Sequence, residues 1–279
     1  RQRQLEDVVH RLSHYDPITG LPNRALLREL VVTDFKLRYQ GSVLGYAWSL
    51  LKPLLMFSIL YVVFVKFLRI GSDIPHYPIY LLLGIVLWSF FSETTGQSLG
   101  SIVARGDLIR KIKIPRWIIV ISASLSALIN LCLNLIVVTA FLILNKVDVT
   151  WTLFLLPLSF AEIYIFALGL SFFLAAAFVK FRDLGNIWDI IIQAGFYITP
   201  ILYPLSLIPN ELFQKILLIN PVAQAIQDAR YSLVTKETVT TWSLLPNWKS
   251  LIPFMIVVVC FLIGVLYFKK QSKTFAENL

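Results

Sequence analysis

The residues of this chain best suited to chemistry are cations gathered in one short segment, residues 104–116. The segment lies between two long apolar runs, and its charges alternate with aliphatic side chains. Its cations are Arg105, Arg110, Lys111, Lys113 and Arg116, and its aliphatic residues include Leu108, Ile109, Ile112 and Ile114. A basic amphipathic segment between two membrane spans can lie at the membrane surface and dock into a partner protein. We therefore predict a membrane protein that is driven from the cytoplasm by a component it does not itself contain.

Residue patterns for catalysis are missing from the sequence. It has no Gly-x4-Gly-Lys-Ser/Thr phosphate loop and no metal-ligand cluster, and both cysteines fall inside apolar runs. The three histidines lie outside the apolar runs, so a membrane-embedded transferase is disfavoured. Glu93, Glu162 and Asp189 fall within apolar runs, and Glu93 is a functional candidate by default, although its spacing suggests no proton relay. We predict no cofactor or metal in this chain and no ATP hydrolysis by it alone.

A third group of candidates consists of aromatic residues on or near the apolar runs. Sugar rings present apolar C–H faces that stack on aromatic side chains, so these residues could line a conduit for a glycan. Lys52, inside the first run, could touch an anionic substrate or instead extend to the inner surface. The alternative for the aromatic set is an ordinary belt at the two membrane interfaces. The predicted conduit residues are Lys52, Phe57, Tyr61, Phe64, Trp88, Phe91, Tyr197 and Tyr203.

The elements that must position these residues are membrane spans. The chain is 57% hydrophobic and only 15% charged, whereas soluble domains are about 45–50% apolar and about 25% charged. A span needs about 20 mostly apolar residues, and six runs are candidates. They are residues 43–65, 77–103, 117–144, 151–179, 187–203 and 251–268. The fifth ends at Thr199-Pro200, and two semi-apolar segments, 212–219 and 222–233, follow it as predicted re-entrant or interfacial helices.

The distribution of cations sets the orientation of these spans. The net charge of +9 is concentrated in the loops, as the positive-inside bias requires, so a nucleic-acid partner is not expected. Segments 1–42, 104–116, 180–186 and 269–279 carry 17 Lys and Arg residues, and segments 66–76, 145–150 and 204–250 carry 7. We predict six spans with both termini inside. Residues 24–42, with a stripe through Leu27, Leu30 and Val31, are predicted to form an amphipathic helix at the inner interface.

Four segments in this order resemble the membrane subunit of ABC exporters for lipid-linked polysaccharide, the O-antigen and teichoic-acid permeases of the type-2 exporter family. The resemblance covers about residues 26–279. It rests on Leu-Val-Val-Thr-Asp-Phe-Lys-Leu-Arg-Tyr-Gln-Gly-Ser-Val-Leu-Gly-Tyr-Ala-Trp-Ser-Leu-Leu-Lys-Pro (30–53), the 105–116 region with Ile114-Pro115, Val-Lys-Phe-Arg-Asp-Leu (179–184), and Thr-Pro-Ile-Leu-Tyr-Pro (199–204) followed by Ile-Asn-Pro (219–221). The family is an all-α polytopic fold, so the resemblance implies an all-α membrane protein of the bacterial cytoplasmic membrane.

The resemblance further implies a homodimer in which each protomer pairs with a cytoplasmic nucleotide-binding ATPase subunit that binds ATP and Mg. Segment 104–115 is similar to the coupling helix of the family, and segment 205–233 to its external gate helices. The residues expected to couple to the ATPase are Arg105, Asp107, Leu108, Arg110, Lys111, Ile112 and Lys113. The implied function is export of a lipid-linked polysaccharide or teichoic acid. The alternatives are a same-fold exporter of a small molecule or drug and a glycolipid-modifying transferase.

One segment departs from this pattern. Residues 14–24, His-Tyr-Asp-Pro-Ile-Thr-Gly-Leu-Pro-Asn-Arg, resemble the opening of a diguanylate cyclase domain, but the Gly-Gly-Asp/Glu-Glu-Phe loop of that domain is missing. We therefore predict two regions. Residues 1–23 form a non-native or fused leader that resembles the start of a cyclase domain, and residues 24–279 form the transmembrane permease domain.

Overall fold

The computed structural model describes residues 22–39, 42, 44–71, 74–111, 115–148, 150–245 and 247–275. Every regular element in these ranges is helical, which confirms the predicted all-α class. Nearly all of the predicted leader, together with Ile112 and Lys113, lies outside the described residues, as do the side chains of Leu108 and Lys111.

Among the described residues, five helices are long and apolar enough to cross a membrane. The first spans Trp48–Phe67 and combines α3 (Trp48–Leu60) with the π-helical η2 (Tyr61–Phe67). The others are α4 (Tyr77–Ala104), α6 (Trp117–Leu144), η3 (Trp151–Leu155) with α7 (Leu156–Lys180), and α12 (Ile252–Gln271) with the flanking η5 (Asn247–Leu251) and η6 (Ser272–Thr274). The chain is therefore a multi-pass membrane protein, and these helices correspond to five of the six predicted spans.

The predicted fifth run forms a shorter helix, α8 (Leu184–Ile198). Its 15 residues span about 22 Å at 1.5 Å per residue, less than the bilayer core of about 30 Å. The helix ends at Thr199, where the backbone turns extended immediately before Pro200. A residue before proline avoids helical geometry, which accounts for the early end that the sequence predicts.

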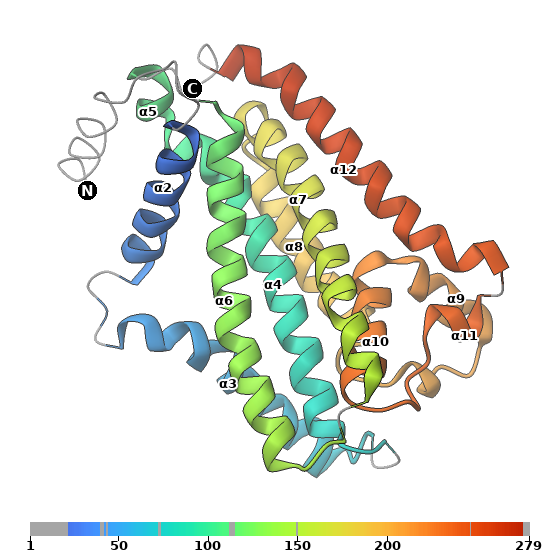
Figure 1. Ribbon diagram of the computed structural model, residues 1–279. Coiled ribbons are helices and arrows are strands. Elements are labelled where there is room, and N and C mark those ends of the chain that lie inside the picture. Colours follow the sequence, from blue (N-terminus) through green and yellow to red (C-terminus); the bar gives the residue numbers. More distant parts are fainter. Residues whose placement is uncertain are drawn as a thin grey trace.

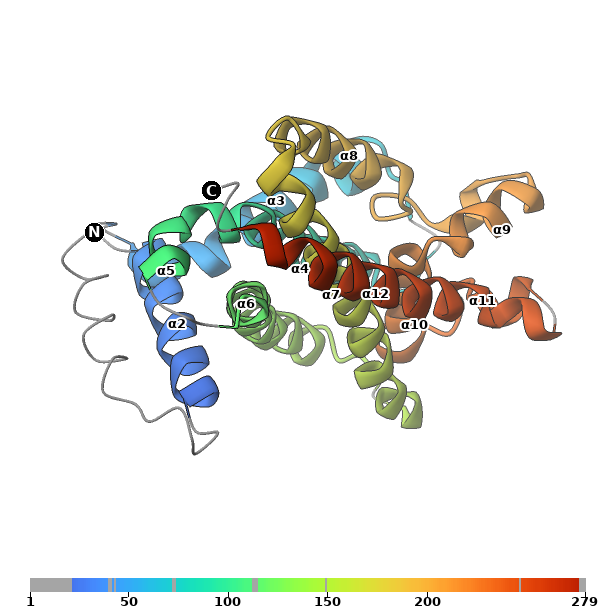
Figure 2. The same cartoon turned by 90° about the horizontal axis from the view of Figure 1, so that it is seen from above.

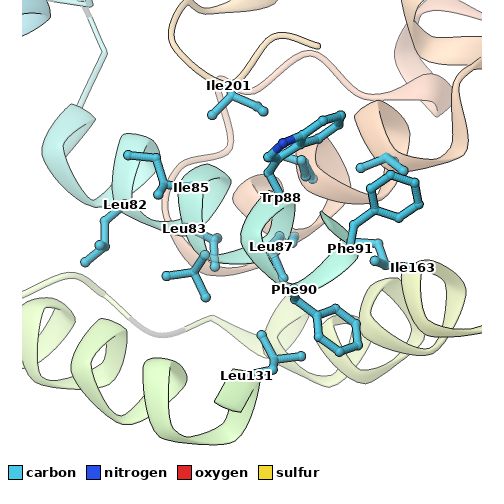
Figure 3. Close-up of a cluster of buried hydrophobic side chains, with 14 of the residues drawn as sticks. Leu82, Leu83, Ile85, Leu87, Trp88, Phe90, Phe91, Leu131, Ile163 and Ile201 are labelled. Carbon is cyan, nitrogen blue, oxygen red and sulfur yellow. The ribbon is translucent and has the colours of Figure 1, made fainter. Parts of the chain in front are cut away.

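Helix α4 is the centre of the bundle (Figures 1 and 2). In its membrane-length window 78% of residues are buried, against 6% for Trp48–Phe67 and 22% for the α12 span. It packs against α6 and α7, and α7 in turn packs against α12. The main core cluster follows α4 and takes Leu131 from α6, Ile163 from α7 and Ile201 from the turn after α8 (Figure 3).

Helices α7 and α12 cross at glycines. A Cβ atom added at Gly169 would lie 2.6 Å from the Phe261 Cα atom, and one added at Gly264 would collide with the Gly169 carbonyl. Small residues let membrane helices approach closely, and dispersion contacts then stabilise the pair.

We expect Gly264→Val to lower the free energy of unfolding by about 1–3 kcal/mol, because the added methyl groups would force the two helices apart. Thermal unfolding in detergent, followed by size-exclusion chromatography, measures this effect. Gly96→Val is the matched control, since nothing lies within 4 Å of a Cβ atom at Gly96. Equal melting temperatures for the two variants would contradict the close crossing.

Two short helices, α9 (Glu211–Ile219) and α10 (Pro221–Leu233), follow α8 and the turn η4 (Leu205–Leu207). Asn210 and Asn220 cap them, each side chain accepting a hydrogen bond from the backbone two residues on. Most of α9 is exposed, whereas α10 is buried against α4 and α7. A further short helix, α11 (Thr241–Leu244), follows α10.

The elements separate into two ends of the bundle. Figure 1 shows α2 (Pro22–Tyr39), α5 (Gly106–Lys111) and the end of α12 together at the top. Helices α9 and α11 lie toward the other end, beside the start of α12. These are called the α5 end and the α9 end below.

Candidate functional site

Within the predicted coupling segment, residues Gly106–Lys111 form α5, a short helix between α4 and α6. Its inward anchor is Ile109, which is buried in a cluster with Ile102, Ile119, Phe172 and Phe268. Asp107 and Arg110 are exposed. The helix therefore rests on the ends of four longer helices and presents charged side chains to the outside.

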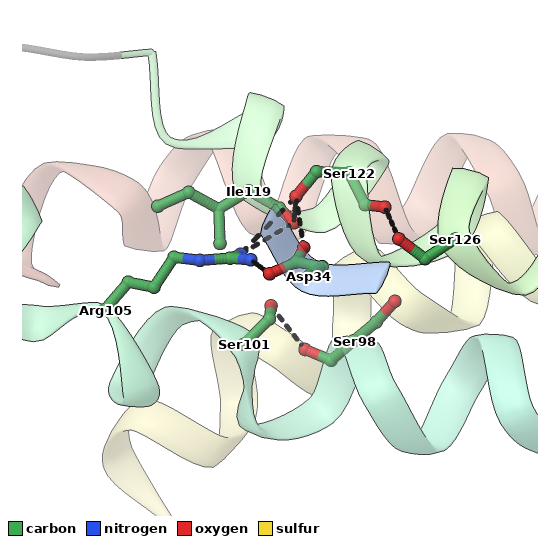
Figure 4. A network of polar contacts seen from close by, with 7 residues as sticks. All are labelled: Asp34, Ser98, Ser101, Arg105, Ile119, Ser122 and Ser126. Carbon is green, nitrogen blue, oxygen red and sulfur yellow. Dashed lines mark hydrogen bonds and ion pairs between the residues drawn. The ribbon is translucent and has the colours of Figure 1, made fainter. Parts of the chain in front are cut away.

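Arg105 lies between α4 and α5 and faces inward rather than outward. Its guanidinium forms an ion pair with the carboxylate of Asp34 on α2 (Figure 4). It also donates to the Ser122 hydroxyl at 3.4 Å and the Ile119 carbonyl at 3.5 Å, both on α6. The Ser122 hydroxyl is 3.3 Å from the other Asp34 oxygen. Three elements thus meet at one charged contact.

The ion pair is well protected from solvent. The side chains of Arg105 and Asp34 are 14% and 24% exposed. Leu26 and Leu30 bury the same face of α2, which packs on α6. Water screens an ion pair in this setting less than it screens a surface pair, and removing one partner would leave the other charge partly buried and unpaired. Asp34 and Arg105 therefore bind the predicted interface helix to the start of α5.

The predicted conduit residues do not share one environment in this chain. Phe57 is buried, with its ring 5.7 Å from Phe141 in an edge-on arrangement. Tyr61 and Phe64 are half-buried on the same helix, and Lys52 is exposed. The aromatic residues on this helix thus face the neighbouring core, while the lysine is accessible.

The remaining conduit candidates divide in the same way. Trp88 is buried, and its ring centroid lies 6.3 Å from that of Phe196 on α8 in an edge-on arrangement. Phe91 stacks on Phe166 at 5.8 Å. Tyr203 is half-buried and donates to the Ile198 carbonyl at 2.8 Å, whereas Tyr197 is 66% exposed. Trp88 and Phe91 pack within the protomer, and Tyr197 offers an accessible aromatic face.

The intramembrane carboxylate Glu93 joins α4 to α6. It accepts hydrogen bonds from the side-chain amides of Gln97 at 2.7 Å and of Asn130. Asn134, one turn farther along α6, donates to the Asn130 carbonyl at 2.8 Å and to the Ser49 carbonyl on α3 at 3.3 Å. Buried amides and carboxylates satisfied in this way tie three helices together.

A second buried cation, Arg230 of α10, organises the α9 end. Its guanidinium donates to the Tyr80 carbonyl at 3.0 Å, the Pro200 carbonyl at 2.6 Å and the Ile201 carbonyl at 2.8 Å. It also stacks on the Tyr80 ring, 3.6 Å from the centroid. Arg230 therefore holds the broken end of α8 against α4. This group of residues is called the Arg230 clamp.

The sequence analysis singled out neither the Asp34–Arg105 pair nor the Arg230 clamp. A weak signal existed for Asp34, which is an acid on the otherwise apolar stripe of residues 24–42. Arg230 is the single cation of segment 222–233. The contacts themselves join residues 71 and about 150 positions apart, so only the fold reveals them.

The chain has clear relatives among known proteins. Residues 25–234 match the family described as ABC-2 type transporter. Over 256 residues the chain is 32% identical to the O-antigen export system permease protein RfbA of Klebsiella pneumoniae, covering 91% of this chain and 95% of that protein. It is 33% identical over 200 residues to the protein of the same name from Myxococcus xanthus, covering 71% and 76%. Identity to the polysialic acid transport protein KpsM of Escherichia coli is 22% over 213 residues, covering 76% and 82%.

Proposed function

The chain belongs to the ABC-2 type transporter family, and we propose that it is the permease subunit of an ATP-driven exporter of lipid-linked polysaccharide. The observation that carries this proposal is the similarity over nearly the whole length to O-antigen export permeases. The relative from Myxococcus xanthus is likewise named an O-antigen export permease, and KpsM is named a polysialic acid transport protein. They favour a glycan substrate over a small molecule or drug and over a glycolipid-modifying transferase.

In this proposal the α5 end is cytoplasmic and both termini are inside, with α8 as a short sixth membrane element. The excess of Lys and Arg in the segments at this end supports the orientation. Helices α9 and α10 then lie toward the outer side as gate helices. Their capped, proline-separated structure suits non-spanning helices at membrane depth, because protein covers the polar backbone of α10.

A separate cytoplasmic ATPase would supply the work, with ATP and Mg bound there. Its motion would reach this chain through α5, whose exposed Asp107 and Arg110 face outward while Ile109 rests on the helix ends. Because the Asp34–Arg105 ion pair joins α2 to the start of α5, a movement of α5 would also move α2. Leu108, Lys111, Ile112 and Lys113 remain predicted coupling residues by their place in the sequence.

The exporter would contain two copies of this chain, with the glycolipid path between them. The first span and α8 leave apolar side chains exposed, including Leu55, Ile59, Ile190, Tyr197 and Ile198. Lys52 and Tyr197 are accessible and would face the path directly, whereas the buried Trp88 and Phe91 would support it from behind.

We expect Arg110→Glu, combined with Lys111→Glu, to uncouple ATP hydrolysis from export, because reversed charge on α5 repels the surface that α5 docks into. The double variant is expressed in a strain whose own copy of the protein is deleted. We expect this strain to lack surface polysaccharide and to accumulate lipid-linked polysaccharide inside the cell. The control is Lys249→Glu, an exposed cation of η5 near the other end of α12. Normal export by the double variant would contradict the proposal.

A further inference from the structure

A cavity of about 960 Å³ opens at the α5 end between α5, α6, α7 and α12. Its floor is apolar and is built mainly by Leu168, Phe172, Phe261 and Val265. Its volume lies within the range of about 300–1,000 Å³ found for sites that bind organic ligands. The apolar floor excludes a fully hydrophilic ligand, because such a ligand would lose its hydration there without new polar partners.

The rim of this cavity is cationic. Arg110 of α5, Arg116 at the start of α6 and Lys269 in the last turn of α12 all line it, and the described lining residues include no carboxylate. The Arg116 guanidinium also lies over the Phe275 ring, 6.0 Å from the centroid. Three cations from separate elements thus converge at one end of an apolar concavity.

Trp117 completes the rim and is 42% exposed. An indole with an apolar body and a polar N–H favours the headgroup level of a membrane. The cavity therefore spans from headgroup level, where the cations and Trp117 lie, toward the hydrocarbon, where the phenylalanines lie. Few ligands other than a membrane lipid match both parts at that depth.

A second cavity, which also lies between α7 and α12, differs from the first in the charge of its lining. It has a volume of about 590 Å³ and is lined by apolar residues of α7, η5 and α12, including Leu170, Phe173, Met255 and Ile263. No charged residue is among its described lining residues. It can accommodate any acyl chain, whereas only the first cavity adds a site for a negative charge.

We propose that the cavity between α5, α6, α7 and α12 binds one anionic phospholipid of the inner leaflet, with its acyl chains on the phenylalanine floor and its phosphate between Arg116 and Lys269. Basic pockets between membrane helices bind acidic headgroups in this way. The bound lipid also contacts Ile109 and Arg110, so it braces α5 against α12. The proposal goes beyond export and does not depend on the nature of the exported glycan.

The test is native mass spectrometry of the full chain, purified in mild detergent and incubated with dioleoyl phosphatidylglycerol or dioleoyl phosphatidylcholine. The two lipids share their acyl chains, so a difference reports the headgroup charge. We expect retention of phosphatidylglycerol to exceed that of phosphatidylcholine by about fivefold for each contacting cation. Arg116→Gln with Lys269→Gln should abolish this preference.

Two further variants keep the test decisive. Lys270→Gln with Lys273→Gln removes two exposed cations beside the cavity that do not line it, and should leave the preference intact. Val265→Phe fills the floor of the cavity without changing its charge and should reduce phosphatidylglycerol binding. It gives an independent test of the site if Arg116→Gln impairs folding.

Several results would overturn the proposal. Equal retention of the two phospholipids would show acyl contact alone, and full displacement by inorganic phosphate would show a simple anion site. Preferential retention of undecaprenyl phosphate over phosphatidylglycerol would make the cavity an entrance for substrate lipid. Unchanged phosphatidylglycerol binding in both the rim and the floor variants would place the lipid elsewhere.

Discussion

Replacing Arg105 with glutamate should reduce polysaccharide export by at least about tenfold while the chain still inserts into the membrane. The substitution sets two carboxylates together at a site where the present side chains are 14% and 24% exposed. Losing a partly buried ion pair costs about 1–3 kcal/mol, which lies between the cost for a surface pair and the cost for a fully buried pair. A change of about 1.4 kcal/mol corresponds to a factor of ten in rate. Quantifying surface polysaccharide in a deletion strain measures the loss.

A charge exchange identifies the cause. Asp34→Arg combined with Arg105→Asp restores an ion pair of opposite polarity and should recover much of the export that either single variant loses. Asp148→Asn is the matched control, because Asp148 is an exposed acid in the loop after α6 and lies outside the coupling segment. If the exchange variant exports no better than the single variants, Asp34 and Arg105 do not act as a pair.

Replacing Arg230 with methionine should lower the melting temperature more than any other single change proposed here. The variant leaves the carbonyls of Tyr80, Pro200 and Ile201 without their donor, and each buried orphan group costs about 1–3 kcal/mol. Arg230→Lys should be intermediate, since an ammonium cannot reproduce the guanidinium fork. Thermal unfolding in detergent measures the order of the three proteins.

Gly84 gives an independent test of the Arg230 clamp. A Cβ atom at Gly84 would collide with the guanidinium and would lie 3.4 Å from the Ile201 side chain. Gly84→Ala should therefore destabilise the protein, although alanine favours a helix. Gly100→Ala, on the same helix in open space, should be neutral or slightly stabilising. A wild-type melting temperature for both Arg230→Met and Gly84→Ala would refute the role of the clamp.

Hydropathy and proline positions predicted most of the helices in this fold. Residues 117–144 are predicted and observed as one helix, and the early end of the fifth run coincides with Pro200. The first run begins later than predicted, at Trp48 rather than residue 43. Gly45, with a φ of 48°, opens the separate single-turn 3-10 helix η1 (Gly45–Ala47) that precedes Trp48.

Side-chain environments were harder to predict than helices. The sequence predicts a coupling role for Arg105 but not its partner within the chain, Asp34, which is 71 residues away. Trp88 and Phe91 look like conduit residues in sequence because aromatic character alone does not distinguish a packed ring from an accessible one. Both questions depend on tertiary packing, which local patterns do not encode.

Proteoliposomes test the central claim most directly. They would contain this chain together with its proposed ATPase subunit, and lipid-linked polysaccharide labelled in the leaflet at the α5 end. The account predicts that adding ATP and Mg moves the glycan to the opposite side, and that Arg110→Glu with Lys111→Glu stops the movement while ATP hydrolysis continues. Glycan movement without ATP, or ATP hydrolysis that never moves the glycan in the unmodified protein, would contradict it.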